Sequence, residues 1–136
     1  MGNNLRLQDD GFCFVCGKNN PSGLGLVFNN INGKVVSEFT PSKIYQGYKG
    51  ITHGGIVSTI LDEAMIYAAV EDGIWPVTAE ITVRFKKPLI TGDTVIVEAE
   101  VVKRSSRLIT ARAQLKRKDD GFLIAEAHAK ISKRFV

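Results

Sequence analysis

Residues 50–70 read GITHGGIVSTILDEAMIYAAV, and this stretch decides the fold of the chain. Its apolar residues recur with a period near 3.6, which places their side chains along one stripe of a helix. The stripe consists of Ile56, Val57, Ile60, Leu61, Ala64, Met65, Ala68 and Ala69. Gly73 follows the stripe, and glycine commonly ends a helix because it adopts the left-handed conformation at little cost. The stretch therefore predicts one long helix with a buried face.

The sequence around this helix predicts strands. Apolar and polar residues alternate, as they do when a strand buries one face, in segments 77–86, 95–101, 109–115 and 123–131. The turn-forming sequences TGD, RSS and DDG separate these segments. Before the helix, residues 24–28 and 34–39 also predict strands, joined by the turn-forming NNING. Because strands and helices do not alternate along the chain, we predict an α+β fold in which one helix packs against one antiparallel sheet.

Length and composition indicate a single domain over residues 1–136, with 44% hydrophobic and 24% charged residues. No apolar run reaches the roughly 18 residues of a membrane span. The first twelve residues lack the basic and then apolar layout of a signal peptide, so we expect a cytoplasmic protein. The net charge of +4 suits a small anionic ligand. The basic residues are spread over several strands without an aromatic stacking motif, so we expect no nucleic-acid binding.

The start of the predicted helix offers free backbone donors. The first N–H groups of a helix lack intrahelical partners and lie at the positive end of its dipole. Glycine lets a ligand atom approach the backbone, so the N–H of Gly54 or Gly55 can donate to a carbonyl oxygen that gains negative charge. His53 precedes the helix and can orient the loop or touch a ligand. In the simpler alternative the glycines only permit a sharp turn into the helix.

Two adjacent carboxylates interrupt the apolar helix. Asp62 lies seven residues after Gly55, close to two helical turns, and Ser58 lies four residues before Asp62 on the same face. Asp62 therefore borders the buried stripe, a position that suits a general base or a nucleophile. Glu63 lies one step further round the helix. The alternative for both carboxylates is a solvated helix face.

The only two cysteines, Cys13 and Cys16, form a Cys-x-x-Cys pair. Structural zinc takes four ligands, and the chain has no second cysteine pair and only two histidines. A redox pair is expected to open a helix after a strand, but Gly17 and Pro21 follow closely. We therefore expect two half-buried thiols in a turn and no metal or cofactor, with a metal shared between subunits and a redox pair as the alternatives.

The segment HGGIVSTILDEAM (53–65) resembles the helix-start motif of hotdog-fold acyl-CoA thioesterases of the phenylacetate-degradation (PaaI-like) family. In that family a His-Gly-Gly sequence is followed by an acidic residue nine places after the histidine. CFVCGKNNPSGLGL (13–26) resembles a segment found in some members. The resemblance implies a hotdog fold, in which an antiparallel β-sheet wraps around one long central helix. It also implies hydrolysis of an acyl-CoA thioester without a metal.

The resemblance assigns roles to individual residues. It implies that Asp62 acts as base or nucleophile on the thioester carbonyl and that the Gly54 N–H binds the carbonyl oxygen. The family site lies at a dimer interface and includes a hydroxyl from the partner's next strand, which Thr78 matches. Many members carry an amide six residues before the histidine. That position is Gly47 in this chain, and Gln46 lies one place away.

Basic residues can hold the phosphates of the CoA nucleotide. The candidates in this chain are Arg84, Lys86, Lys87, Lys103, Arg104 and Arg107. Three of them belong to KRSSR (103–107), which is predicted to form a turn between strands. The alternative is that these charges only keep the surface soluble.

Two other functions compete with hydrolysis. Hotdog dehydratases and hydratases pair a helix Glu with a histidine in an HFPG-like loop, and Glu63 lacks that loop. A non-catalytic acyl-CoA sensor is the second alternative, although such a protein is expected to lose its acid. Since an exposed sheet edge is usually paired or covered, we expect at least a homodimer, and the family often forms dimers of dimers.

Overall fold

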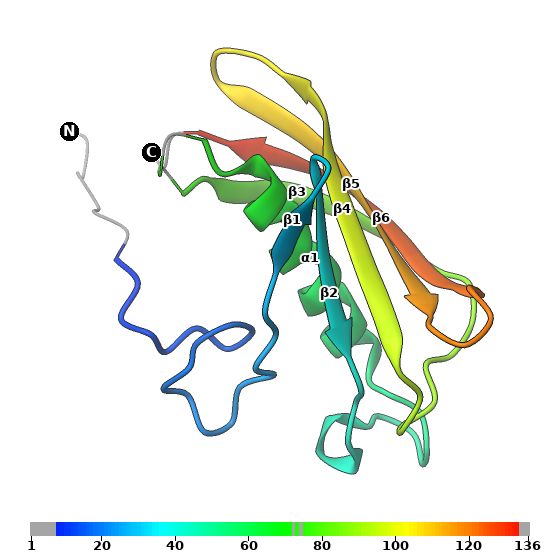
Figure 1. The fold of residues 1–136 in the computed structure, drawn as a ribbon. Coiled ribbons are helices and arrows are strands. Elements are labelled where there is room, and N and C mark those ends of the chain that lie inside the picture. Colours follow the sequence, from blue (N-terminus) through cyan, green and yellow to red (C-terminus); the bar gives the residue numbers. More distant parts are fainter. Residues whose placement is uncertain (1–7, 72, 74, 134–136) are drawn as a thin grey trace.

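The computed structural model describes residues 8–71, 73 and 75–133. One α-helix, α1 (Gly54–Ala69), and a short 3-10 helix, η1 (Lys43–Tyr45), accompany the strands. The strands are β1 (Asn29–Ile31), β2 (Lys34–Phe39), β3 (Val77–Phe85), β4 (Val95–Arg104), β5 (Leu108–Arg117) and β6 (Leu123–Ser132). The long strands form a curved sheet with α1 against one face (Figure 1). The predicted arrangement of one helix against an antiparallel sheet is confirmed.

The strand order is β1-β2-β4-β5-β6-β3, and each neighbouring pair is antiparallel. β3 follows the helix in sequence but pairs only with β6, so it forms one edge of the sheet. The other edge is the three-residue β1. Because β3 has nine residues, it presents a long edge whose outward backbone groups have no strand partner within the described residues.

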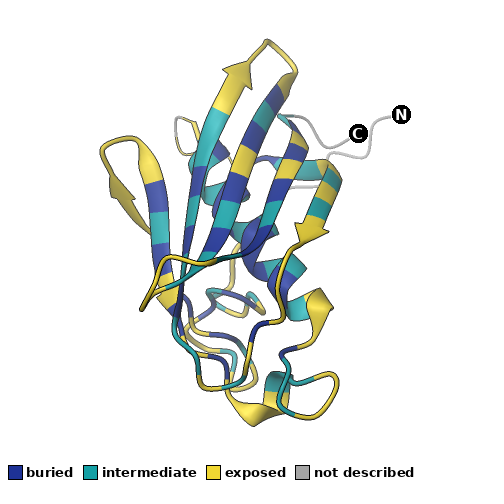
Figure 2. Ribbon diagram, turned by 90° about the vertical axis from the view of Figure 1, so that its right-hand side faces the viewer, coloured by how far each residue is buried: buried dark blue, intermediate teal, exposed yellow. Residues whose placement is uncertain are grey.

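The core lies between α1 and the central strands. Ile60, Leu61, Ala64 and Met65 of the helix are fully buried. Along the strands beneath them, buried residues alternate with residues that are partly or fully exposed, which Figure 2 shows as colour bands. Many of the buried strand residues are alanines: Ala99, Ala111, Ala113, Ala125, Ala127 and Ala129. Such small side chains let the helix pack close to the sheet.

The edge strand β3 departs from the predicted alternation. Its apolar residues were expected to lie on a buried face, yet Ala79 and Phe85 are exposed and Ile81 and Val83 are only partly buried. A strand at the edge of a sheet has a neighbour on one side only, which leaves its apolar face incompletely covered.

The prediction for the first strand is wrong. β1 begins at Asn29 instead of residue 24, and the turn is confined to Asn32 and Gly33, whose φ angles are 53° and 84°. Two central residues with positive φ form the tight hairpin turn that matches strand twist. Residues 24–26 instead bond to the N-terminal segment, with Leu24 N–H donating to Phe14 O at 2.8 Å.

The helix ends at Ala69, four residues before the predicted stop at Gly73. The Arg104 guanidinium donates to the carbonyls of Ala68 and Ala69, each at 3.4 Å, and to Glu71 at 3.1 Å. A cation at this position satisfies the last carbonyls and complements the negative end of the helix dipole. No helix in the described part of the chain is long and apolar enough to cross a membrane.

Arg104→Ala is expected to lower the free energy of unfolding by about 1 kcal/mol, because it removes the charged donor that ends the helix. Urea unfolding followed by circular dichroism measures this change. Lys103→Ala is the matched control, since Lys103 is the exposed neighbouring cation on the same strand. Equal stability of the two variants would contradict the capping role.

Candidate active site

A short loop places His53 at the start of α1. Gln46 and Thr52 form an isolated antiparallel bridge, and the His53 N–H donates to Tyr45 O at 2.8 Å. These bonds hold the backbone of His53 at φ −58° and ψ 135°, outside the helical region, so the helix begins at the next residue. His53 is therefore the residue that caps the helix.

The His53 cap uses the backbone N–H of Gly55 and leaves the backbone N–H of Gly54 free. His53 Nδ1 accepts the Gly55 N–H at 2.8 Å, so the proton of the neutral ring lies on Nε2. A side chain on Gly55 would place its Cβ 3.0 Å from that nitrogen, which disfavours any larger residue. Within the described residues no hydrogen bond uses the Gly54 N–H. The structure thus distinguishes the glycines: Gly55 belongs to the cap, and Gly54 offers a donor.

A hollow of about 320 Å³ lies beside Gly54. It is lined by Ile51, Thr52, Gly54, Val57, Phe85, Lys86, Lys87, Pro88 and Leu89. A Cβ on Gly54 would lie 3.4 Å from Phe85 Cε1, so the aromatic ring lies against the bare backbone. The free N–H therefore belongs to a residue that lines a space bounded by an aromatic ring and two cations.

Asp62 is half-buried in the middle of the helix, where Thr78 Oγ1 donates to its Oδ1 at 2.6 Å. Thr78 lies near the start of β3, so the bond joins the helix to the edge strand. The other oxygen of Asp62, Oδ2, has no hydrogen bond among the described residues. The hydroxyl reaches the acid of its own chain, whereas the resemblance implied a hydroxyl from the partner subunit.

Gly54 and Asp62 lie about 80° apart around the axis of α1 and at different heights. Eight residues separate them, which corresponds to a rise of about 12 Å along the helix axis. A single carbonyl group cannot contact both the Gly54 N–H and the Asp62 carboxylate across that distance. One chain therefore holds two half-sites instead of one complete site.

Three expected substrate contacts take part in hydrogen bonds within the chain. Ser58 Oγ donates to Gly54 O at 3.1 Å, which fastens the first helical turn. Gln46 Oε1 accepts the Gly50 N–H at 3.2 Å and stabilises the loop before His53. Glu63 accepts a hydrogen bond from the Cys13 thiol at 3.2 Å. In this structure these side chains support the loop, the helix start and the N-terminal segment.

The expected phosphate-binding cations divide into two groups. Lys103, Arg104 and Arg107 lie around the β4–β5 turn, and Arg104 contacts the end of α1. That end is about 22 Å from Gly54 along the helix axis. Lys86 and Lys87 instead share the hollow with Gly54, and Arg84 is exposed on the neighbouring part of β3. Within one chain only the second group lies near the free N–H.

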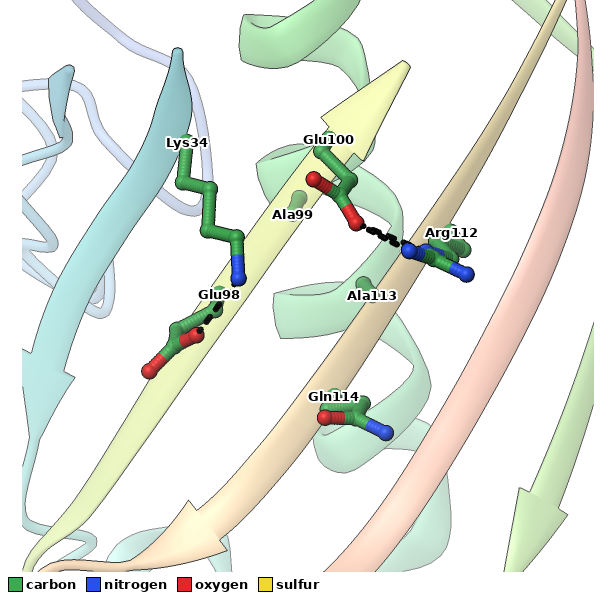
Figure 3. A pocket seen from close by; sticks show the side chains of 7 residues that line it. All are labelled: Lys34, Glu98, Ala99, Glu100, Arg112, Ala113 and Gln114. Atoms are coloured by element: carbon green, nitrogen blue, oxygen red, sulfur yellow. Dashed lines mark hydrogen bonds and ion pairs between the residues drawn. The ribbon is translucent and has the colours of Figure 1, made fainter. Parts of the chain in front are cut away.

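A separate hollow of about 220 Å³ lies on the face of the sheet away from α1 (Figure 3). Its charged side chains are already paired, Lys34 with Glu98 and Arg112 with Glu100. The Arg112 guanidinium holds the pKa of Glu100 below its usual value. Neither Gly54 nor Asp62 lines this hollow, so the candidate site lies on the helix side of the sheet.

The cysteine pair lies against the middle of the helix, and both thiols are half-buried, as predicted. Burial raises the pKa of Cys16 to about 12, opposed by a hydrogen bond from the Tyr67 hydroxyl. The thiol is therefore protonated at neutral pH, which disfavours a nucleophilic or redox role, since the thiolate is the reactive form. The contact between Cys13 and Glu63 was not predicted, because fifty residues separate them.

Comparison with known proteins identifies the family. Residues 49–124 match the model of the thioesterase superfamily. The chain belongs to the thioesterase superfamily. The chain is 32% identical to acyl-coenzyme A thioesterase THEM4 of Xenopus laevis over 104 aligned residues. This alignment covers 76% of the chain and 47% of that relative. The chain is also 28% identical to human acyl-coenzyme A thioesterase 13 over 96 residues, covering 69% of each protein.

The chain spans about half the length of the THEM4 relatives that it matches. Solved structures show the same fold. The thioesterase superfamily protein RHA08564 has a TM-score of 0.83 at 22% identity, over 90% of this chain and 60% of that one. The Escherichia coli PaaI protein from the phenylacetic acid degradation operon has a TM-score of 0.75 at 21% identity, over 82% and 81%. The predicted PaaI-like resemblance and hotdog fold are confirmed.

Proposed function

We propose that this member of the superfamily hydrolyses an acyl-CoA thioester to the free acid and CoA. The observation that carries the proposal is the pair of half-sites on α1. A half-buried Asp62 is held by Thr78 with one oxygen unpaired, and a Gly54 N–H is left free at the positive end of the helix. The names of the relatives, which are acyl-coenzyme A thioesterases, support the same reaction.

The complete site is built from two copies of the chain. Gly54 and Asp62 of one chain lie about 12 Å apart along the helix, which is too far for one thioester carbonyl. Pairing of two β3 edges about a two-fold axis runs the two helices in opposite directions. Gly54 of one copy then faces the Asp62–Thr78 pair of the other. The pairing also covers the exposed apolar residues of β3. Further pairing into a dimer of dimers and a cytoplasmic location remain predictions.

The chemistry follows from the two half-sites. Asp62 removes a proton from water, and the hydroxide adds to the thioester carbon; alternatively the carboxylate adds directly and water cleaves the resulting anhydride. In both routes the carbonyl oxygen becomes negative and is stabilised by the Gly54 N–H and the helix dipole. In both routes this intermediate breaks its C–S bond, and the sulfur of CoA takes up a proton. In the direct route the same step forms the anhydride, which water then cleaves to regenerate the Asp62 carboxylate. The Thr78 hydrogen bond to Oδ1 holds the Asp62 side chain and leaves Oδ2 free to meet either the attacking water or the thioester carbon.

The nucleotide end of the substrate fits the basic side of the hollow beside Gly54. Lys86 and Lys87 line that hollow, and ammonium groups bind phosphate as point charges. Lys86 lies 3.9 Å from Glu126, a distance at which an exposed pair is weak enough to give way to phosphate. Arg84, Lys103 and Arg107 remain candidates for contacts made across the interface between copies.

Hydrolysis is tested by thiol release from a panel of aryl, short-chain, medium-chain and 3-hydroxyacyl CoA thioesters, with a blank that corrects for the protein's own two thiols. Turnover of at least one thioester is the expected result. Tight binding without turnover would replace the enzyme with an acyl-CoA sensor. Appearance of an enoyl product would favour the dehydratase instead. The hydrogen bond from Cys13 to Glu63 argues against that reaction, because it already occupies the helix glutamate.

Two inactive variants are expected to complement each other. In a mixture of Gly54→Pro and Asp62→Asn chains, a mixed dimer contains one site with an intact Gly54 from one chain and an intact Asp62 from the other. Random pairing makes half of the dimers mixed, with one working site of two, so activity should recover to about a quarter of wild type. Thiol release before and after subunit exchange measures the recovery. A mixture that stays inactive while mass spectrometry shows mixed dimers would place both residues in a site within one chain.

A further inference from the structure

Three potential metal ligands meet where the N-terminal segment crosses α1. The Sγ atoms of Cys13 and Cys16 and a carboxylate oxygen of Glu63 all lie within 4.8 Å of one another, and all three residues are half-buried. The closest pair is Cys13 Sγ and Glu63 Oε2 at 3.2 Å. The proposed hydrolysis uses none of these groups, so their assembly needs another explanation.

The turn that carries the cysteines is built to present both sulfurs on one side. The Val15 N–H donates to Cys13 Sγ at 3.4 Å, and the Gly17 N–H donates to Cys13 O at 2.9 Å. A Cβ on Gly17 would lie 2.3 Å from Cys13 N, so only glycine allows the chain to turn this tightly. The buried Val15 anchors the turn in the core. The sulfurs are thus held by the backbone instead of moving with a loose loop.

The helix supplies a second layer around the sulfurs. Tyr67 lies one helical turn after Glu63, and its hydroxyl is close enough to Cys16 to lower the pKa of that thiol. The Tyr67 ring stacks on Phe28 with centroids 4.5 Å apart and meets Trp75 edge-on at 4.9 Å, which fixes the position of the hydroxyl. Donors from Val15 and Tyr67 therefore reach the two sulfurs, as partners of metal-bound sulfur commonly do.

We propose that Cys13, Cys16 and Glu63 bind a thiophilic divalent cation, which in the cell is Zn²⁺. Zinc takes sulfur ligands at about 2.3 Å and carboxylate oxygen at about 2.1 Å, so tetrahedral ligands lie about 3.6–3.8 Å apart. The three observed groups need only small side-chain movements to reach that spacing. On binding, two Zn–S bonds and one Zn–O bond form, and the two thiol protons pass to solvent without any electron transfer. The charge of the ion offsets the burial that keeps the metal-free Cys16 thiol protonated, because a coordinating metal deprotonates a thiol.

The fourth position of a tetrahedral ion is left to water. The cluster lines a pocket of about 380 Å³ together with Phe12, Ile66, Tyr67 and Trp75, and this pocket has room for the water molecule. Three protein ligands and one position left to water are also the composition of catalytic zinc sites. The ion also ties the N-terminal turn to α1, because its ligands come from both segments.

Cobalt titration tests the site, because Cys13 and Cys16 are the only thiols in the chain. Full-length protein is stripped with chelator, kept reduced with a phosphine, and titrated with Co²⁺ while thiolate-to-cobalt absorption is recorded. We expect the absorption to saturate at one equivalent and to disappear when Zn²⁺ is added. Cys13→Ser and Cys16→Ser should lose it. Absence of thiolate absorption in the reduced wild-type protein overturns the proposal.

Glu63→Gln tests the third ligand without removing a sulfur. Loss of a direct ligand should weaken Co²⁺ and Zn²⁺ binding by at least the about 10–100-fold that follows loss of an outer-shell partner. Glu71→Gln is the matched control, since Glu71 lies just beyond the same helix and pairs with Arg104 instead of a cysteine. Wild-type affinity in Glu63→Gln, with circular dichroism showing a folded protein, also overturns the three-residue site. Metal binding is measured separately from thioester turnover. A negative metal titration would therefore overturn the zinc site without contradicting the proposed hydrolysis.

Discussion

Asp62→Asn is expected to lower kcat for the best acyl-CoA substrate by about 10²–10⁴-fold, the usual contribution of a positioned general base. Asparagine has the shape of aspartate, and its carbonyl oxygen can still accept the Thr78 hydrogen bond at 2.6 Å. The amide can neither take a proton from water nor attack the thioester. Steady-state thiol release gives kcat and KM, and titration calorimetry should show that acyl-CoA binding is retained.

Asp119→Asn is the matched control for this substitution. Asp119 is exposed in the turn between β5 and β6, so the same change of carboxylate to amide should leave kcat at the wild-type value. A fall in kcat confined to Asp62→Asn identifies the reacting acid. If Asp62→Asn retained more than half of wild-type turnover, the hydrolytic mechanism proposed for Asp62 would be wrong.

Gly54→Pro is expected to lower kcat by about 10²–10³-fold, the usual cost of losing one donor to an oxyanion. Proline removes the backbone N–H that no side-chain truncation can remove. Gly54 is the first helical residue, where proline is tolerated because its missing N–H has no intrahelical acceptor. His53, at φ −58° and ψ 135°, already has the extended conformation required before proline. The helix should therefore persist while the donor is lost.

Gly54→Ala is the control, because alanine adds a Cβ near Phe85 but keeps the N–H. We expect Gly54→Ala to retain much more activity than Gly54→Pro, with both variants showing wild-type helix content by circular dichroism. Equal losses of kcat would mean that the added carbon blocks the hollow. In that case the Gly54 N–H would not be the group that stabilises the carbonyl oxygen.

Periodicity in the sequence determined most of the fold. A period near 3.6 in residues 56–69 identified the helix, and a period of 2 identified the four strands that follow it, because burial of one face imposes these patterns. The same local rules indicated the glycine-rich helix start and an acid two turns later on one face. Such features depend on residues close together in the chain, so the sequence alone could predict them.

Tertiary structure decided which side chains meet across long separations. Arg104 ends a helix 35 residues earlier, Cys13 bonds to Glu63 across 50 residues, and Thr78 reaches Asp62 from the edge strand. None of these contacts leaves a periodic signal, because each depends on how separate elements pack. The 24–28 strand prediction failed for the same reason, since an apolar run does not specify its partner. The sequence by itself determined the elements and the reactive residue types. Only packing decided that the edge strand places Thr78 against Asp62 and Phe85 against Gly54, because these contacts join separate elements of the fold.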